Sequence, residues 1–325
     1  MSTTLRRHAP LALAVGAALM FSACSAPAAA PNQPAAATIQ VTDNRGTVAV
    51  PSPPQRVIAT DNRLFQTLAE WNVKLVAAPV AIIEADSPYK KDPSVVDLGF
   101  HTEPNLEALV ATNPDLVING QRFSTQYDAI KKLAPQAAML DLNVREDQPF
   151  DAELKRQVQA LGPVFGKKAE ADKLVADFDA AVARVKAAYK PGSKVMTVIT
   201  SGGKINYAAP KTGRTLGPVY DILGLTPALT AEGTEDHEGA EISVEAIAAS
   251  NPEWILVMDR DAALAASVKD YKPANELLAN SAALKNVDAV KQKRIIYMPA
   301  NTYLNEGLQT YTTFFNSIAD AMESS

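Results

Sequence analysis

Residues 105–118 read NLEALVATNPDLVI, and residues 243–256 read SVEAIAASNPEWIL. Both stretches have a polar first residue, a Glu-Ala pair, an Asn-Pro pair followed by an acid, and an apolar run, all at the same offsets. Asn105 and Ser243 are residue types that cap helices, so each stretch predicts a capped helix, a turn and a β-strand. The two begin 138 residues apart, about the length of one domain. The repeat predicts two related α/β lobes.

The segments around these two stretches continue the alternation of strand and helix. A hairpin is expected first, because residues 38–41 and 47–50 flank a turn-forming Asp-Asn-Arg-Gly. Helices are expected at 124–133, 217–224, 243–250 and 305–322, and strands at 57–59, 74–77, 116–119, 137–140, 194–200, 254–258 and 295–298. Strands that alternate with helices predict mainly parallel sheets with helices on their faces, an α/β fold.

A long amphipathic stretch separates the two blocks. Residues 167–189 place apolar side chains at helical spacing, and Pro191-Gly192 ends the pattern. We therefore predict an N-terminal lobe at 39–165, one connecting helix at 166–190 and a C-terminal lobe at 191–325.

The first residues resemble an export signal. Residues 1–23 contain Arg6 and Arg7, an apolar run too short to span a bilayer, and small residues before Cys24. Cys24 is the only cysteine and stands where the bacterial lipoprotein box has its acylated cysteine. We expect cleavage before Cys24, a lipid on its sulfur and an Ala/Pro-rich tether at 24–38. An ordinary signal peptide with an incidental cysteine is the alternative.

Composition excludes several classes of function. The formal net charge of −5 argues against nucleic-acid binding, and one Cys with three His leaves no Cys-based metal site or internal disulfide. The phosphate-binding, nucleophile-elbow, dinucleotide and metalloprotease motifs are all missing. We expect a binding protein with no intrinsic cofactor, not an enzyme.

Arg122 and Arg260 follow the expected strands 116–119 and 254–258. Open α/β sheets bind ligands at the carboxyl ends of their strands, so facing lobes would direct both guanidinium groups into one cleft. The alternative for each arginine alone is a solvated charge or an ion pair with a nearby acid.

An exported, tethered protein with two α/β lobes and one connecting helix resembles the solute-binding proteins of ABC importers, in the class that carries ferric siderophores, haem and vitamin B12 (class III periplasmic binding proteins). The closest resemblance is to ferric-catecholate binders of the enterobactin or petrobactin type. It covers residues 39 to about 322 and is carried by EPNLEALVATNPDLVI at 103–118, QRFSTQYDAIKKLAP at 121–135, NPEWILVMDR at 251–260 and RIIYMPANTYL at 294–304.

The resemblance implies a set of ligand-binding residues. It adds Arg214, in the loop AAPKTGRTLG, to Arg122 and Arg260 as a third contact to catecholate oxygens. A ferric tris-catecholate is an anion, and guanidinium groups both donate to oxygens and stack on rings. The resemblance also places His237 and Tyr303 where they can complete the iron coordination of a tetradentate siderophore. A surface histidine and a hydrogen-bonded tyrosine are the alternatives.

Glu107 and Glu245 are the repeated glutamates of the two lobes. A carboxylate in the first turn of a helix is stabilised by the helix dipole, which is a sufficient structural reason for both. In the resembled family, one glutamate per lobe at this place docks on the two subunits of the permease.

Together these residues imply a lipid-anchored, extracytoplasmic, monomeric protein of the cell membrane that captures a ferric siderophore. Its partners would be an ABC permease dimer and a cytoplasmic ATPase. A haem binder that uses His237 and Tyr303 as axial ligands is the alternative, and a vitamin B12 binder is a weaker one.

Overall fold

The repeated stretches fold alike. In the computed structural model, which describes residues 37–265 and 269–325, they form helix α3 (Leu106–Ala111) with strand β6 (Leu116–Asn119), and helix α8 (Val244–Ser250) with strand β11 (Trp254–Asp259). The two predicted caps are confirmed: Asn105 Oδ1 accepts from the Ala108 amide at 2.9 Å, and Ser243 Oγ accepts from the Ala246 amide at 3.1 Å.

Both helices end in the same way. Asn113 and Asn251 adopt positive φ angles of 45° and 41°. Asparagine tolerates the left-handed region better than most residues, and the proline that follows cannot continue a helix. The Asn-Pro pair therefore turns each chain from helix into strand.

Each repeat belongs to its own five-stranded sheet. The first sheet has the order β5-β4-β3-β6-β7 and all of its pairings are parallel. The second has the order β10-β8-β11-β12, with parallel pairings, and β9 adds to β8 in an antiparallel manner. The remaining strands of these sheets are β3 (Val57–Ala59), β4 (Leu75–Ala78), β5 (Val96–Asp97), β7 (Ala138–Asp141), β8 (Lys194–Ser201), β9 (Lys204–Tyr207), β10 (Thr226–Pro227) and β12 (Ile295–Tyr297). The predicted α/β class with mainly parallel sheets is confirmed.

The expected hairpin is present as β1 (Thr38–Asp43) paired with β2 (Gly46–Pro51). The connecting helix is α6 (Lys168–Ala188), close to the predicted bounds. The other helices are α1 (Phe65–Glu70), α2 (Pro88–Lys91), α4 (Tyr127–Leu133), α5 (Phe150–Val164), α7 (Val219–Leu223), α9 (Ala274–Ala279), α10 (Asp288–Lys291) and α11 (Leu308–Glu323). Five short 3₁₀ turns complete the elements: η1 (Val80–Ile82), η2 (Gln121–Gln126), η3 (Asp261–Leu264), η4 (Leu284–Asn286) and η5 (Thr302–Leu304). The proposed lobe boundaries stay predictions.

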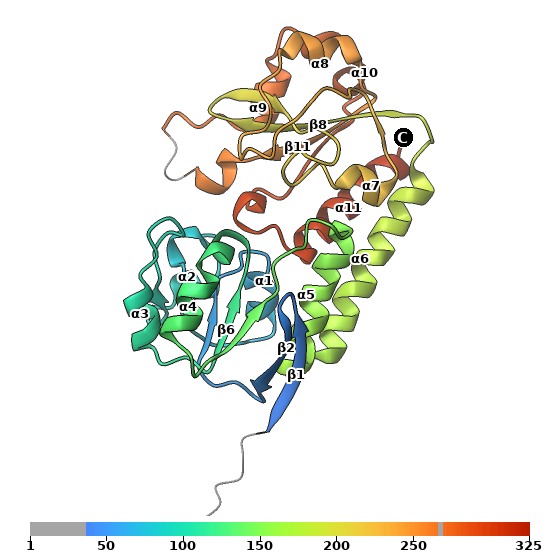
Figure 1. Cartoon of the computed structure of the whole chain (residues 1–325). Helices are drawn as coiled ribbons and strands as arrows, with labels where there is room; N and C mark the ends of the chain where they lie inside the picture. Colours follow the sequence, from blue (N-terminus) through green and yellow to red (C-terminus); the bar gives the residue numbers. More distant parts are fainter. Residues whose placement is uncertain (1–36, 266–268) are drawn as a thin grey trace, which may run out of the picture. The chain divides into compact units, whose positions relative to one another are not determined.

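Helix α6 packs against two other helices, α5 and α11 (Figure 1). The ring centroids of Phe178 and Phe315 lie 5.6 Å apart, and Arg184 donates to Asp320 and Glu323 at 2.6 and 2.8 Å. The buried faces of all three helices belong to one hydrophobic core together with strands of both sheets. The last helix of the chain therefore supports the segment that joins the two sheets.

Residues 1–36 lie outside the described part of the chain, and with them Cys24 and the predicted leader. Within the described ranges, none of the helices combines the length and the apolar character that a bilayer crossing requires.

Candidate functional site

Three arginines surround the ring of Tyr303. The guanidinium carbons of Arg122, Arg214 and Arg260 lie 4.9, 5.6 and 4.9 Å from the ring centroid, within the range of cation–π contacts. Arg122 follows β6, Arg260 follows β11, and Arg214 comes from the loop between β9 and α7. The structure thus brings together the three arginines that the sequence analysis singled out.

His237 lies beside the same tyrosine. Its Nδ1 is 3.3 Å from the Tyr303 hydroxyl, and the two rings meet edge to face with centroids 5.9 Å apart. Partial burial and the three arginines, Arg214 foremost, lower the pKa of His237. The imidazole is therefore neutral at pH 7, the form that can accept a hydrogen bond or ligate a metal.

Some hydrogen-bond donors of these arginines have an acceptor among the described residues, and others have none. Arg260 Nη1 donates to Ser201 and Asp261, and Arg122 Nη2 reaches the Tyr303 carbonyl at 3.4 Å. The Nε groups of both Arg122 and Arg260 are buried without a hydrogen-bond acceptor. A buried, charged donor without a partner is costly, so this arrangement favours an anionic ligand that brings its own oxygens.

Glu306 is the buried counter-charge of Arg214 in this cluster, and the sequence analysis did not identify it. Its carboxylate accepts from Arg214 Nη2 at 3.1 Å, from Thr215 Oγ1 at 2.5 Å and from Gln121 Nε2 at 3.3 Å. Burial alone would raise its pKa, but Arg214 and Arg63 outweigh burial and lower it. Glu306 is therefore a buried carboxylate that anchors Arg214, and its position three residues after Tyr303 was the available signal.

A cavity of about 810 Å³ opens beside this cluster. Arg122, Arg214 and His237 line it, whereas Arg260 and Tyr303 do not. Its further lining includes Arg63, His101, Gln121, residues 143–146 and 148–151, residues 211–213, Thr215, Glu306 and Tyr311. The volume lies within the range of small-molecule sites.

Two of these lining residues were not expected there. Arg63 follows the short strand β3, so the rule that located Arg122 and Arg260 applies to it equally. His101 lines the cavity with a buried Nδ1 that has no partner. Burial and the neighbouring Arg122 lower the pKa of His101, so it is neutral as well.

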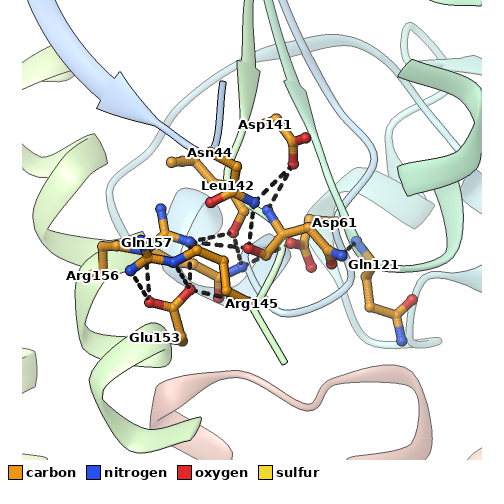
Figure 2. Close-up of polar contacts among 10 residues, drawn as sticks. Asn44, Asp61, Gln121, Asp141, Leu142, Arg145, Glu153, Arg156 and Gln157 are labelled. Atoms are coloured by element: carbon orange, nitrogen blue, oxygen red, sulfur yellow. Dashed lines mark hydrogen bonds and ion pairs between the residues drawn. The ribbon is translucent and has the colours of Figure 1, made fainter. Parts of the chain in front are cut away.

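One wall of the cavity is fixed by a buried acid. Glu153, at the start of α5, accepts from Arg145 Nη2 at 2.5 Å and from Arg156 Nη2 at 2.7 Å (Figure 2). Arg156 also donates to the Asn143 carbonyl. Burial alone would raise the pKa of Glu153, but these hydrogen bonds lower it to about 2. The loop at 143–150 is thereby tied to a charged group that stays ionised.

The backbone of the lining is unusual. Gln121, Lys211 and Thr215 have φ angles of 47°, 70° and 64°, values that residues with a side chain seldom adopt. The Gln121 amide donates to Asn143 Oδ1, which holds this conformation at the end of β6. Such strained residues gather where a fold must present side chains to a ligand.

Glu107 and Glu245 are not part of this site. Both are exposed and occupy the first turns of α3 and α8, beside the caps of those helices. They do not line the cavity. Within the described ranges, no cluster of three or more His, Cys, Asp or Glu side chains could hold a metal ion.

The chain is similar to known proteins in sequence and in fold. The family model described as "Periplasmic binding protein" matches residues 57–302. The chain is 32% identical over 281 residues to the ferric-anguibactin-binding protein FatB of Vibrio anguillarum, covering 83% of each chain. It is 27% identical to the petrobactin-binding protein YclQ of Bacillus subtilis, covering 98% of this chain and 100% of that one.

The crystal structure of YclQ from Bacillus subtilis superposes with a TM-score of 0.74 at 25% identity and covers 89% of this chain and 100% of that one. The catecholate-siderophore binding protein VctP from Vibrio cholerae, at 21% identity and a TM-score of 0.72, shares the fold over 89% of this chain and 100% of that one. This protein belongs to the periplasmic binding protein family.

Proposed function

We propose that this protein captures a ferric siderophore with catecholate groups and delivers it to an ABC importer. The observation that carries the proposal is the set of three arginines around Tyr303, two of which hold buried Nε donors without an acceptor. FatB and YclQ, whose names state that they bind ferric anguibactin and petrobactin, support it.

The chemistry of the cluster suits this ligand. Catecholate oxygens carry negative charge that Fe(III) only partly neutralises, and guanidinium groups satisfy such oxygens with charge-assisted hydrogen bonds. The catechol rings offer faces on which arginines stack. No covalent step is required of the protein, because capture and release suffice.

His237 and Tyr303 would complete the coordination of a siderophore that supplies only four donors. Their nitrogen and oxygen atoms lie 3.3 Å apart, so the pair can approach one metal ion from the same side. Imidazole and phenolate are both donors that Fe(III) accepts. The iron is cargo in this proposal and leaves with the siderophore.

Anchoring and docking complete the proposal. Acylation of Cys24 would hold the protein at the extracytoplasmic face of the cell membrane. The anchored protein would act as a monomer. Glu107 and Glu245 would then contact the two subunits of the permease dimer, whose ATPase subunits lie in the cytoplasm. The support is that the two carboxylates are exposed and equivalent by the internal repeat.

The test is a titration of the purified protein, followed by tryptophan fluorescence, with four ligands: a ferric tris-catecholate, a ferric tetradentate catecholate, a ferric hydroxamate and haem. Tight binding of the catecholates alone is the expected result. A preference for the tetradentate complex supports iron contact by His237 and Tyr303. Binding of haem with a shifted Soret band, and of no catecholate, would overturn the proposal in favour of haem uptake.

A further inference from the structure

Arg63 is a cation of the cavity that the arginine cluster around Tyr303 does not include. It comes from the loop after β3, lines the cavity, and is only 15% exposed at its side chain. Its guanidinium carbon lies 5.8 Å from the ring centroid of Phe150. The Arg63 guanidinium thus lies near an aromatic ring of the cavity lining, at the outer limit of the cation–π range.

The donors of Arg63 are poorly satisfied. Its Nη2 lies 4.0 Å from Oε2 of Glu306, beyond hydrogen-bond distance, while Arg214 Nη2 approaches the same oxygen to 3.1 Å. The Nε of Arg63 is buried and has no hydrogen-bond acceptor. Arg63 is therefore close enough to Glu306 for an electrostatic attraction but does not form a hydrogen bond with it.

The neighbouring acids are engaged elsewhere. The Glu306 oxygens already accept from Arg214, Thr215 and Gln121. Asp61 accepts from the Arg63 backbone amide through Oδ1 and from Gln157 through Oδ2, so its carboxyl does not cap the guanidinium either. Neither acid hydrogen-bonds to the Arg63 guanidinium, so a ligand in the cavity that Arg63 lines can supply an acceptor.

We propose that Arg63 binds a carboxylate of the ligand, at a subsite separate from the arginines that bind catecholate oxygens. A carboxylate presents two coplanar oxygens, which match the fork of a guanidinium edge, and it needs no free face for stacking. The inference rests on the proposed function and refines it: the preferred ferric siderophore carries an acidic group outside its catechols.

One ligand can reach both subsites. Arg63 Nη2 and Arg214 Nη2 lie 4.0 and 3.1 Å from the same Glu306 oxygen, so the two groups are at most the sum of these distances apart. A carboxylate on the linker between two catechols spans such a separation. The same carboxylate chemistry is available from ferric citrate, which contains no catechol.

The test pairs a change in the protein with a matched change in the ligand. The probes are a ferric bis-catecholate with a free carboxylate on its linker, its carboxamide counterpart, and ferric citrate. Arg63→Gln should lower the affinity for the acid about ten- to a hundredfold and for the amide less than about twofold. Arg63→Lys, which keeps the charge and loses the fork, should fall between the wild type and Arg63→Gln.

The outcomes separate the subsite from the function. If the wild type binds acid and amide equally well, or if Arg63→Gln weakens both equally, the subsite is refuted while the catecholate function stands. If the wild type binds neither catecholate complex, the proposed function is refuted, and the subsite that rests on it is refuted as well. Weakened binding of ferric citrate in Arg63→Gln supports the subsite and shows that its carboxylate need not come from a catecholate ligand. Unchanged melting temperatures confirm that both variants are folded.

Discussion

The hydroxyl of Tyr303 lies 3.3 Å from Nδ1 of His237. This contact joins the segment after β12 to the polar loop before α8, and the three arginines enclose the tyrosine ring. The imidazole thus sits in a field of three positive charges, which disfavours a fourth. Its protonation reports directly on the arginine cluster.

The first prediction concerns that protonation. The pKa of His237 is lowered, so its NMR titration midpoint in the ligand-free protein should lie below 6.5. Removal of one positive charge by Arg214→Gln should raise the midpoint, because Arg214 is the strongest of the three charge contributions. His101→Gln identifies the second titrating imidazole among the described residues. A midpoint that does not move in Arg214→Gln would contradict the charge argument.

The second prediction concerns the arginines themselves. Arg122→Gln and Arg260→Gln should each lower the affinity for a ferric tris-catecholate about ten- to a hundredfold, because each variant removes a guanidinium charge from the cluster around Tyr303 that attracts the anionic ligand. Isothermal titration calorimetry measures this. Lys173→Gln removes the same charge from an exposed i,i+4 pair with Asp177 and should change the affinity less than about twofold. Equal losses of affinity in all three variants would show that only the net charge of the protein matters, and would contradict the prediction.

The third prediction concerns Glu306. Glu306→Gln leaves Arg63 and Arg214 without their buried counter-charge and should lower the free energy of unfolding by about 3 kcal/mol. Urea denaturation measures it, with Glu323→Gln as the control: Glu323 also pairs with an arginine but is 47% exposed, so its loss should cost less than about 1 kcal/mol. A bound anionic ligand should stabilise Glu306→Gln more than the wild type. Similar unfolding energies for the two variants would show that Glu306 does not anchor the cluster.

The fourth prediction is a pH dependence. The pKa of Glu153 is lowered to about 2 in the folded protein from 4.5. A carboxyl whose pKa is lower in the folded state stabilises it above the unfolded pKa and loses that contribution as the pH falls from about 4.5 towards 2. The partner Arg145 is 43% exposed, so solvent screens the pair and the contribution is about 2 kcal/mol. Glu153→Gln should remove this part of the acid dependence of the melting temperature; an unchanged acid profile would contradict it.

The fifth prediction separates binding from delivery. Glu107→Ala and Glu245→Ala should leave ligand affinity unchanged, because both residues lie outside the cavity, and should abolish stimulation of the importer's ATPase in proteoliposomes. Each should lower the free energy of unfolding by less than about 1 kcal/mol, the value of a carboxylate near a helix N-terminus. Glu276→Ala, an exposed first-turn glutamate of α9, is the matched control and should retain stimulation.

The fold was accessible from the sequence because its signals are local. Asn105 and Ser243 cap helices by contacts within four residues, and the Asn-Pro pairs set the turns after them. Helix α5, at Phe150–Val164, escaped the sequence analysis, and the packing of α11 on α6 depends on side chains more than a hundred residues apart, such as Arg184 and Glu323.

Only part of the candidate site could be predicted from the sequence. Arg122 and Arg260 lie within three residues of the ends of β6 and β11, so the sequence places them at strand ends. Arg63 follows β3, which has only three residues, and Glu306 acts through partners that come from both halves of the chain, Gln121 and Thr215. Apart from its closeness to Tyr303 in the sequence, nothing near Glu306 in the chain indicates that it is the counter-ion of these arginines.

The order of segments along the chain has a consequence for biosynthesis. Tyr303 and Glu306 immediately precede α11, and α11 is the element that packs back against α6 through Phe315 and Arg184. During synthesis, the other residues that line the cavity emerge before Glu306, except Tyr311, which belongs to α11 itself. The complete pocket can therefore form only after α11 has been synthesised, so an unfinished chain cannot retain a ligand.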